Sequence, residues 1–295
     1  PFLSLATVYV FSPNFSRLQM SFFNGKAVIV TGSSNGIGRA TARMLAGKGA
    51  KVTIHGRNPE TIKVTKEQCL AAGAKEEDIL IVLGEIEKDE TRLSLVNETV
   101  DKFGGIDVLV NNAGLIRTAA DGRVGLDAPV EILDAIMEIN LRAVLQLVQL
   151  AVPHLEKTKG AIVNVSSIAS MPFTTKDFYY SLSKAALDEL TVNLGGNLIL
   201  KDIRVNSVNP GGVETDFMRK YMPEDVVEKI YTEKWNNNRT AIPLGRVSVP
   251  DDIAKVILFL ADRSQSEVIV GQRIVADGGS TLQNVILSTN MPSNH

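Results

Sequence analysis

Short, nearly continuous apolar runs alternate with longer amphipathic stretches along most of the chain. The runs predict strands at residues 27–31, 51–55, 79–83, 106–110, 161–166, 204–208 and 268–275. Apolar residues at three- and four-residue spacing predict helices at roughly 37–48, 59–72, 89–103, 129–157, 179–200 and 251–262. Continuous apolar strands that alternate with helices are typical of parallel βαβ units. The pattern therefore predicts an α/β fold: a single doubly wound domain whose seven-stranded, mainly parallel sheet carries helices on both faces.

The same pattern sets the expected domain boundaries. Residues 1–22 precede the first strand and are expected to form a poorly ordered extension, 23–283 form the domain, and 284–295 form a tail. Residues 212–249 are too long for an ordinary connection, so we expect a lid over a substrate. The pair Gly195-Gly196 weakens a predicted helix, which predicts a kink or a close helix contact there.

Composition narrows the class of protein. The 295 residues include 31 Lys and Arg against 33 Asp and Glu, a net charge of -2, so no nucleic-acid partner is expected. A single cysteine, Cys69, cannot close an intrachain disulfide and permits a cytoplasmic location. The three histidines show no metal-ligand spacing, so no metal is expected. No apolar run reaches the roughly 18 to 20 residues of a membrane span, and none is expected.

A glycine-rich stretch, TGSSNGIG at residues 31–38, directly follows the first predicted strand and opens a helix. Glycines let the backbone approach a pyrophosphate, and a helix N-terminus offers unpaired N–H groups. The alternative is a tight turn with no ligand. The position at the first strand–helix junction favours dinucleotide binding.

The spacing TGxxxGxG, in place of GxGxxG, resembles that of the short-chain dehydrogenase/reductase family. Further motifs of that family occur in order: Asn111-Asn112-Ala113-Gly114, Asn140, Ser167, Tyr180 with Lys184, Pro210-Gly211 and Asp277-Gly278-Gly279. The resemblance covers about residues 23–282. It implies a Rossmann fold, a nicotinamide cofactor and oxidoreduction of alcohols and ketones.

The end of the second strand bears on the choice of cofactor. NAD sites usually place a carboxylate there, whereas this chain has Gly56 followed by Arg57, which could hold a 2'-phosphate or be a solvated charge. The sequence thus favours NADP(H) over NAD(H). Where the family usually has an aspartate near the adenine, this chain has Glu85. The cofactor-binding residues implied by the resemblance are Gly32, Ser34, Asn35, Gly36, Ile37, Gly38, Arg57, Asn58, Glu85, Ile86, Asn112, Ala113, Gly114, Tyr180, Lys184, Pro210, Gly211, Val213 and Thr215.

Tyr180 and Lys184 lie four residues apart on a predicted helix and so share a face. An ammonium lowers the pKa of a nearby phenol from its usual value near 10, which makes it a better acid. The resemblance implies that Tyr180 is the general acid and base, that Lys184 also binds the nicotinamide ribose, that Ser167 orients the carbonyl and that Asn140 holds a water molecule. Ser166 is the alternative to Ser167, and Asn140 could be an ordinary helix polar group.

These residues predict an NADP(H)-dependent carbonyl reductase or alcohol dehydrogenase acting on a small ketone or secondary alcohol. The alternatives are a 3-oxoacyl-carrier-protein reductase, a sugar or steroid dehydrogenase, and a dinucleotide-sensing protein without turnover. The turn Gly56-Arg57-Asn58 resembles that of tropinone-reductase-like members. Residues 115–129, 168–178 and 213–240 should border an apolar substrate pocket. Family members commonly associate through the helices that correspond to 129–157 and 179–200, which implies a homodimer or homotetramer.

Overall fold

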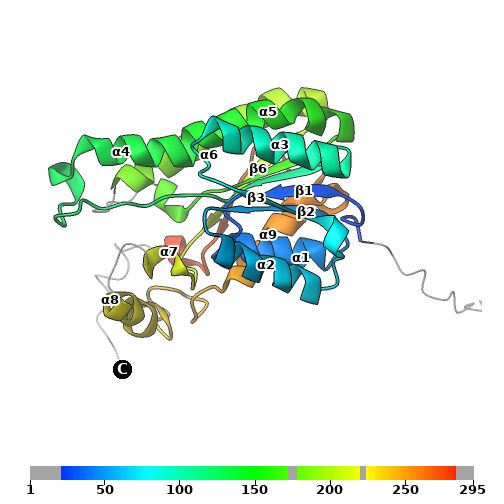
Figure 1. Cartoon of the computed structure of the whole chain (residues 1–295). Coiled ribbons are helices and arrows are strands. Elements are labelled where there is room, and N and C mark those ends of the chain that lie inside the picture. Colours follow the sequence, from blue (N-terminus) through cyan, green and yellow to red (C-terminus); the bar gives the residue numbers. More distant parts are fainter. Residues whose placement is uncertain (1–20, 172–177, 220–223, 284–295) are drawn as a thin grey trace, which may run out of the picture.

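The computed structural model describes residues 21–171, 178–219 and 224–283. Its centre is one sheet of seven parallel strands in the order β3-β2-β1-β4-β5-β6-β7 (Figure 1). The strands are β1 Ala27–Val30, β2 Lys51–Gly56, β3 Ile79–Leu83, β4 Val108–Asn111, β5 Ala161–Val165, β6 Arg204–Pro210 and β7 Arg273–Ala276. The predicted fold class is confirmed, and within the described residues every strand pair is parallel.

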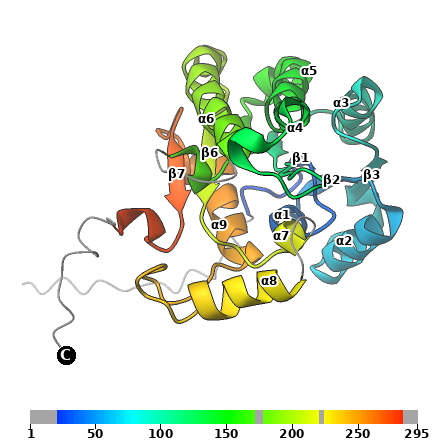
Figure 2. The ribbon, with the colours of Figure 1, turned by 90° about the vertical axis from the view of Figure 1, so that its left-hand side faces the viewer.

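Helices cover both faces of the sheet (Figures 1 and 2). They are α1 Gly36–Ala46, α2 Pro59–Ala71, α3 Asp89–Phe103, α4 Val130–Met137, α5 Ala143–Thr158, α6 Phe178–Leu198, α7 Asp216–Arg219, α8 Glu224–Lys229, α9 Pro250–Ala261 and α10 Arg263–Ser266. Neighbouring strand residues point to opposite faces. Val28 and Val30 therefore join the core beneath α1 and α9, while Ile29 joins the core beneath α3, α5 and α6.

The strand order places the functional cleft. The chain runs outward from β1 through β2 to β3, then returns to form β4 on the other side of β1. At such a switch point the loops at the carboxyl ends of the two central strands diverge and leave a crevice. The loops after β1 and β4 are those that carry the TGSSNGIG and Asn111-Asn112-Ala113-Gly114 motifs.

The last strand was predicted too long. β7 covers Arg273–Ala276, whereas the apolar run had placed a strand at 268–275. Val268 follows α10 and is 93% exposed. Gly271 (φ +67°) turns the chain toward the sheet, and its amide donates a hydrogen bond to the Val205 carbonyl oxygen (2.8 Å). The three consecutive apolar residues 268–270 thus precede the sheet and are not part of it.

The helix predicted at 129–157 is continuous from 130 to 158, but it contains one wider turn. The π-helix Glu138–Arg142 separates α4 from α5 and carries Asn140. Among the described residues, Val130–Thr158 is the one helix long and apolar enough to cross a membrane by length and composition, although no uninterrupted apolar run of that length occurs in it. Its residues Leu147 and Leu155 are fully buried and belong to the core on one face of the sheet.

Residues 212–249 contain α7, α8 and the π-helix Ile230–Trp235. They have a small core of their own, in which Val227, Tyr231, Ile242 and Val247 are buried. In Figure 1, α7 and α8 lie together beside one end of the sheet. Of the glycine pair in α6, only Gly195 makes a close contact, and its partner is the backbone of Gly271 in the turn before β7.

Candidate active site

A cleft of about 450 Å³ opens where β1, β4, β5 and β6 end. It is lined by most of the residues predicted to bind cofactor or to take part in catalysis: Gly32, Ser34, Asn35, Gly36, Ile37, Arg57, Ile86, Asn112, Ala113, Gly114, Ser167, Tyr180, Lys184, Pro210, Gly211, Val213 and Thr215. Four predicted residues do not line it: Gly38, Asn58, Glu85 and Asn140. The fold thus gathers motifs spread over nearly 200 residues of sequence at one place.

The glycine-rich loop passes tightly against the loop after β4. Gly32 has φ +61°, and a Cβ there would lie 2.8 Å from the Cα of Ala113, so only glycine fits. Asn35 is the N-cap of α1 but its side chain makes no capping hydrogen bond, and the first turn of α1 holds no acidic residue. The N-terminus of α1 therefore faces the cleft, and no side chain in the described ranges caps its N–H groups, an arrangement that favours an anion such as a phosphate.

His55, at the end of β2, supports this loop and was missed in the sequence analysis. Its Nδ1 accepts a hydrogen bond from the Gly32 amide (3.1 Å), so Nε2 carries the proton and donates to the Gly84 carbonyl oxygen (3.2 Å). Burial lowers the pKa of His55 to about 4, against the Gly84 hydrogen bond and with a smaller contribution from the charge of Arg57. The neutral ring thus joins the end of β2 to the loops after β1 and β3.

Two arginines near the glycine loop differ in their availability. Arg39 donates to the carbonyl oxygens of Ser34 and Thr61 and to the Thr65 hydroxyl, so its guanidinium is already engaged. Arg57 is exposed on the cleft wall and has no hydrogen-bond or ion-pair partner among the described residues. Of the two, Arg57 is the one available to a ligand.

Two residues predicted to bind the cofactor, Asn58 and Glu85, do not line the cleft. The Asn58 side chain caps α2 by accepting hydrogen bonds from the amides of Glu60 (2.8 Å) and Thr61 (3.2 Å), so it is engaged away from the cleft. Glu85 is exposed, and the cleft wall is formed instead by Ile86 and Glu87. The acidic residue that lines the cleft here is Glu87, and the contact of Glu85 with the adenine stays a prediction. Gly38 packs against the side chain of Asn112 behind the wall.

Tyr180 and Lys184 share one face of α6, as their spacing predicts. The Lys184 ammonium is 5.7 Å from the centroid of the Tyr180 ring and donates to the Val165 carbonyl oxygen (2.9 Å). The Lys184 side chain is almost completely buried, and burial lowers its pKa to about 8 although the negative charge of Asp188 acts to raise it. A lysine with that pKa remains mostly charged at neutral pH.

Asn140 lies behind the cleft in the π-helical turn. Its Oδ1 accepts from the Leu115 amide (2.7 Å), and its Nδ2 donates to the Leu115 carbonyl oxygen (2.8 Å) and to the Ser183 hydroxyl (3.0 Å). A Cβ on Gly114 would lie 3.5 Å from the Asn140 Oδ1 and 3.7 Å from the Lys184 ammonium, so both side chains border Gly114. The side chain thus ties the loop after β4 to α6, and the predicted water remains a prediction.

The two candidate serines differ in what their hydroxyls do. The buried Ser166 donates to the Lys184 carbonyl oxygen (3.3 Å). Ser167 is half-buried on the cleft wall, and its Oγ accepts from the Ala169 amide (3.1 Å), which leaves its hydrogen available to a ligand. The geometry favours Ser167 as the residue that contacts substrate.

A buried polar network lies beneath Ser167 and was also missed. The Asn209 side-chain amide donates to Asp188 Oδ2 (2.7 Å), to the Ser170 hydroxyl (3.1 Å) and to the Ser167 carbonyl oxygen (3.2 Å). Asp188 is 4% exposed, and its Oδ1 has no hydrogen-bond partner in the described part of the chain. Its position four residues after Lys184 on the same helix face is a signal that could have revealed it.

Much of the cleft wall is apolar. Its apolar side chains include Leu115, Ile116, Ile139, Ile168, Phe217, Met218 and Trp235. The Phe217 ring centroid is 6.1 Å from that of Tyr180. The charged residues on the wall are Arg57, Glu87 and Lys184 within the described ranges. The predicted pocket residues Phe173, Lys176, Lys220, Tyr221 and Met222 lie outside those ranges.

Comparisons with known proteins agree with this geometry. A family model described as enoyl-(acyl carrier protein) reductase matches residues 32–281. The chain is 35% identical over 256 residues to the 3-oxoacyl-[acyl-carrier-protein] reductase FabG of Thermotoga maritima, covering 86% of this chain and 97% of that protein.

Two solved structures from Caenorhabditis elegans are similar throughout. A short-chain dehydrogenase/reductase of unknown function with cofactor has a TM-score of 0.88 and 43% identity, covering 90% of this chain and 99% of that one. A glucose dehydrogenase in its apo form has a TM-score of 0.75 and 44% identity, covering 88% and 99%. The narrower likeness to tropinone-reductase-like members stays a prediction. From the family model, the curated relative and these structures, the chain belongs to the short-chain dehydrogenase/reductase family, whose members are oxidoreductases.

Proposed function

We propose that the protein interconverts a ketone and a secondary alcohol with NADP(H), using Tyr180 as general acid and base. The observation that carries this proposal is the convergence of Tyr180, Lys184 and Ser167 on one cleft with the glycine-rich loop. A non-catalytic dinucleotide sensor would not need a phenol and an ammonium on the same wall as a hydroxyl donor.

Each polar side chain has a task in the reduction. Ser167 donates its hydroxyl hydrogen to the carbonyl oxygen and fixes its direction. Tyr180 transfers its phenolic proton to that oxygen as negative charge develops on it. The Lys184 ammonium stabilises the resulting phenolate, which lowers the free energy of the proton transfer. Asn140 holds the loop after β4 against α6. When bound, the nicotinamide ring supplies the hydride in reduction and accepts it in oxidation.

The chain's own residues fit a dinucleotide with a 2'-phosphate. The uncapped N-terminus of α1 would receive the pyrophosphate, and Arg57 has a guanidinium with no partner in the described structure beside Gly56. A carboxylate at the end of β2 would instead favour NAD(H). The cofactor choice therefore depends on Arg57.

Replacing Arg57 by aspartate tests this choice. Because hydrogen bonds to charged groups contribute about 1.5–3 kcal/mol, we expect Arg57→Asp to weaken NADPH binding about 10- to 100-fold. Affinity for NADH in the same variant is the internal control and should hold or improve. Calorimetric titration with both dinucleotides measures the ratio, and an unchanged ratio would place the phosphate elsewhere.

The apolar side chains of the cleft wall favour a neutral ketone with apolar flanks as substrate, since burying unpaired sugar hydroxyls against them would cost free energy. The similarity to FabG and to a glucose dehydrogenase keeps 3-oxoacyl thioesters and sugars as the competing substrates. A kinetic screen would separate these substrates. It would follow NADPH oxidation with apolar cyclic and open-chain ketones and with a 3-oxoacyl thioester, and NADP⁺ reduction with sugars and steroid alcohols. The highest kcat/KM is expected for an apolar ketone. Tight NADPH binding without turnover of any of them would favour the sensor.

We further propose that the protein forms a homodimer or homotetramer through the helical run 130–158 and α6. Three apolar side chains on these helices are exposed in the single chain: Val130, Leu182 and Val192. We also propose a cytoplasmic location, which the single cysteine permits. Residues 212–249 are proposed to cover the substrate, since Phe217, Met218 and Trp235 line the cleft.

A further inference from the structure

The segment between β6 and α7 forms one wall of the cleft, through Gly212, Val213 and Thr215. On one side it pairs with residue 248, since the Glu214 amide donates to the Ser248 carbonyl oxygen (2.8 Å) and the Ser248 amide to the Gly212 carbonyl oxygen (3.2 Å). Its far end reaches the glycine-rich loop, because a Cβ on Gly36 would lie 3.1 Å from the Thr215 methyl group. A shift of this segment would therefore change the cofactor end of the cleft.

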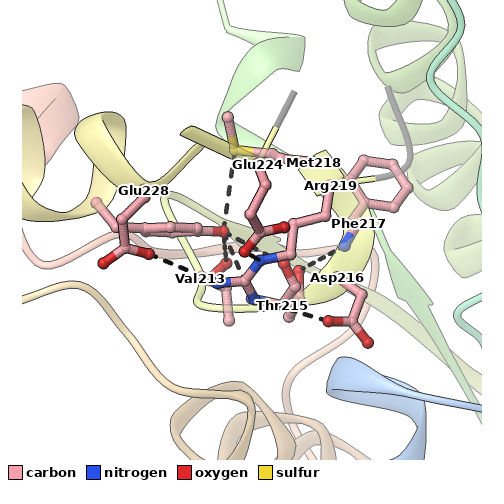
Figure 3. A network of polar contacts seen from close by, with 9 residues as sticks. Val213, Thr215, Asp216, Phe217, Met218, Arg219, Glu224 and Glu228 are labelled. Carbon is pink, nitrogen blue, oxygen red and sulfur yellow. Dashed lines mark hydrogen bonds and ion pairs between the residues drawn. The ribbon is translucent and has the colours of Figure 1, made fainter. Parts of the chain in front are cut away.

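The hydroxyl of Tyr231, in the π-helix after α8, holds the segment at Val213 and Thr215, both labelled in Figure 3. It donates to the Val213 carbonyl oxygen (2.9 Å) and accepts from the Thr215 amide (3.4 Å). Tyr231 is 4% exposed, and burial is the main reason that its pKa is raised, so the phenol keeps its proton at neutral pH. One buried hydroxyl thus fixes a donor and an acceptor two residues apart.

Trp235 adds a packing contact to the same segment. It lies four residues after Tyr231, and the two rings meet edge to face with centroids 5.5 Å apart. A Cβ on Gly212 would come within 2.8 Å of the indole carbons Cε3 and Cζ3, so the indole lies directly on the Gly212 backbone. The π-helical turn therefore presents two aromatic side chains to three cleft-lining residues, Gly212, Val213 and Thr215.

The Arg219 guanidinium lies near the Tyr231 ring and pairs with three carboxylates, which Figure 3 shows around it. Its guanidinium carbon is 6.0 Å from the Tyr231 ring centroid, and the guanidinium pairs with Glu224 (2.9 Å), Asp216 (3.7 Å) and Glu228 (3.9 Å). These contacts join α7 to α8 across the ring. The carboxylates are mostly exposed, so the ion pairs add little stability individually, but together they limit where the ring can go.

We propose that Tyr231 is a positioning residue for the cofactor: its hydroxyl sets the backbone of residues 213–215 so that this wall fits the nicotinamide end of the dinucleotide. The inference rests on the proposed function, in which the nicotinamide lies beside Tyr180; Phe217, two residues after Thr215, has its ring centroid 6.1 Å from that of Tyr180. It assigns the inserted helices α7 and α8 a role in cofactor binding in addition to covering the substrate.

The test uses Tyr231→Phe, which keeps the ring, its contact with Trp235 and its packing against Arg219 but removes the hydroxyl. We expect the Kd of NADPH for the full-length protein to rise about five- to tenfold, the effect of losing one buried hydrogen-bonded group. The matched control is Tyr179→Phe. Tyr179 also donates to a backbone carbonyl oxygen, that of Ala128 (3.1 Å), but does not line the cleft, so this variant should bind NADPH like the wild type.

A second ligand separates positioning from a general loss of structure. 2'-Phosphoadenosine diphosphoribose is the NADP molecule without its nicotinamide ring, and Tyr231→Phe should bind it within twofold of the wild type. Equal NADPH binding by Tyr231→Phe and wild type would overturn the inference, and so would an equal loss of both ligands. A wild-type protein that binds the fragment and NADPH with the same weak affinity as free phosphate would instead overturn the proposed function, and the inference with it.

Discussion

At the scale of single residues, Lys184 carries its charge where water is nearly absent. Burial alone would favour the neutral amine, and the nearby carboxylate of Asp188 offsets part of that cost. The pKa of Lys184 is lowered to about 8, so its ammonium is lost as the pH rises through 8 and not through its usual value of 10.5. The reduction rate should therefore fall on the alkaline side near pH 8.

Asp188→Asn removes the carboxylate and keeps the shape of the side chain. Without the negative charge the pKa of Lys184 falls further, so the alkaline limb of the reduction rate should move to lower pH. The pH profile of kcat/KM measures this shift, with Asp101→Asn as the control, since Asp101 is an exposed carboxylate on α3. An alkaline limb that stays at its wild-type pH in Asp188→Asn would mean that this carboxylate does not act on Lys184.

The sequence predicts Tyr180 and Lys184 well because a four-residue spacing on a helix gives a shared face. It does not predict His55 or Asn209, whose partners are 21 and more residues away in sequence. Residues of that kind are recognised only when the fold has placed the ends of several strands side by side. The position of Glu85 relative to the cleft is hard to predict because it lies in a loop, where a shift of one or two residues changes which side chain faces the cleft.

At the scale of helices and strands, α6 shows how local preference and packing compete. Glycine in a helix interior costs about 1 kcal/mol relative to alanine, yet α6 has two in a row. A Cβ on Gly195 would lie 2.6 Å from the Cα of Gly271, whereas a Cβ on Gly196 would meet nothing within 4 Å. The first glycine is required by a neighbouring backbone, and the second is not.

The two alanine variants should therefore change the free energy of unfolding in opposite directions. Gly196→Ala should raise it by up to about 1 kcal/mol, since alanine is the better helix former. Gly195→Ala should lower it by roughly 1–3 kcal/mol, because α6 or the turn at Gly271 must move. Urea unfolding measures both, and stabilisation by Gly195→Ala would show that the contact with Gly271 is not tight.

The sequence predicts whether a segment is a helix or a strand where its apolar pattern extends over many residues. The errors in the bounds of helices and strands fall where a single residue changes the direction of the backbone or widens a helical turn. The turn at Gly271 separates residues 268–270 from β7, and the wider turn at Asn140 divides a helix whose apolar pattern is continuous. A π-turn adds one residue without breaking the helix, so the periodicity before and after it gives no warning.

At the scale of the whole molecule, strand order places the glycine-rich loop beside the loop after β4. β1 lies between β2 and β4, so segments separated by about 80 residues of sequence meet: the Thr31 hydroxyl accepts hydrogen bonds from the amides of Asn112 and Ala113 in the loop after β4. The alternation of strands and helices predicts this parallel sheet. It does not predict how residues 212–249 pack, because several short helices can satisfy the same apolar pattern.

We expect the mass of the protein in solution to be two or four times that of one chain, which is 31.9 kDa. The physical reason is that exposed apolar side chains on the two long helices lose contact with water when two copies associate. Light scattering coupled to gel filtration gives the mass, and Val192→Glu should shift it toward one chain. A wild-type mass near 31.9 kDa at micromolar concentration would contradict the proposed interface.

The most direct test of the account is the reduction rate of Tyr180→Phe with the best ketone found for the wild type. The variant keeps the ring and loses only the group that donates the proton, so NADPH should bind within about twofold of the wild type. Its kcat should fall by roughly 10²- to 10⁴-fold, the usual contribution of a general acid. Reduction at a rate near that of the wild type would contradict the role of Tyr180 and with it the mechanism proposed for this cleft.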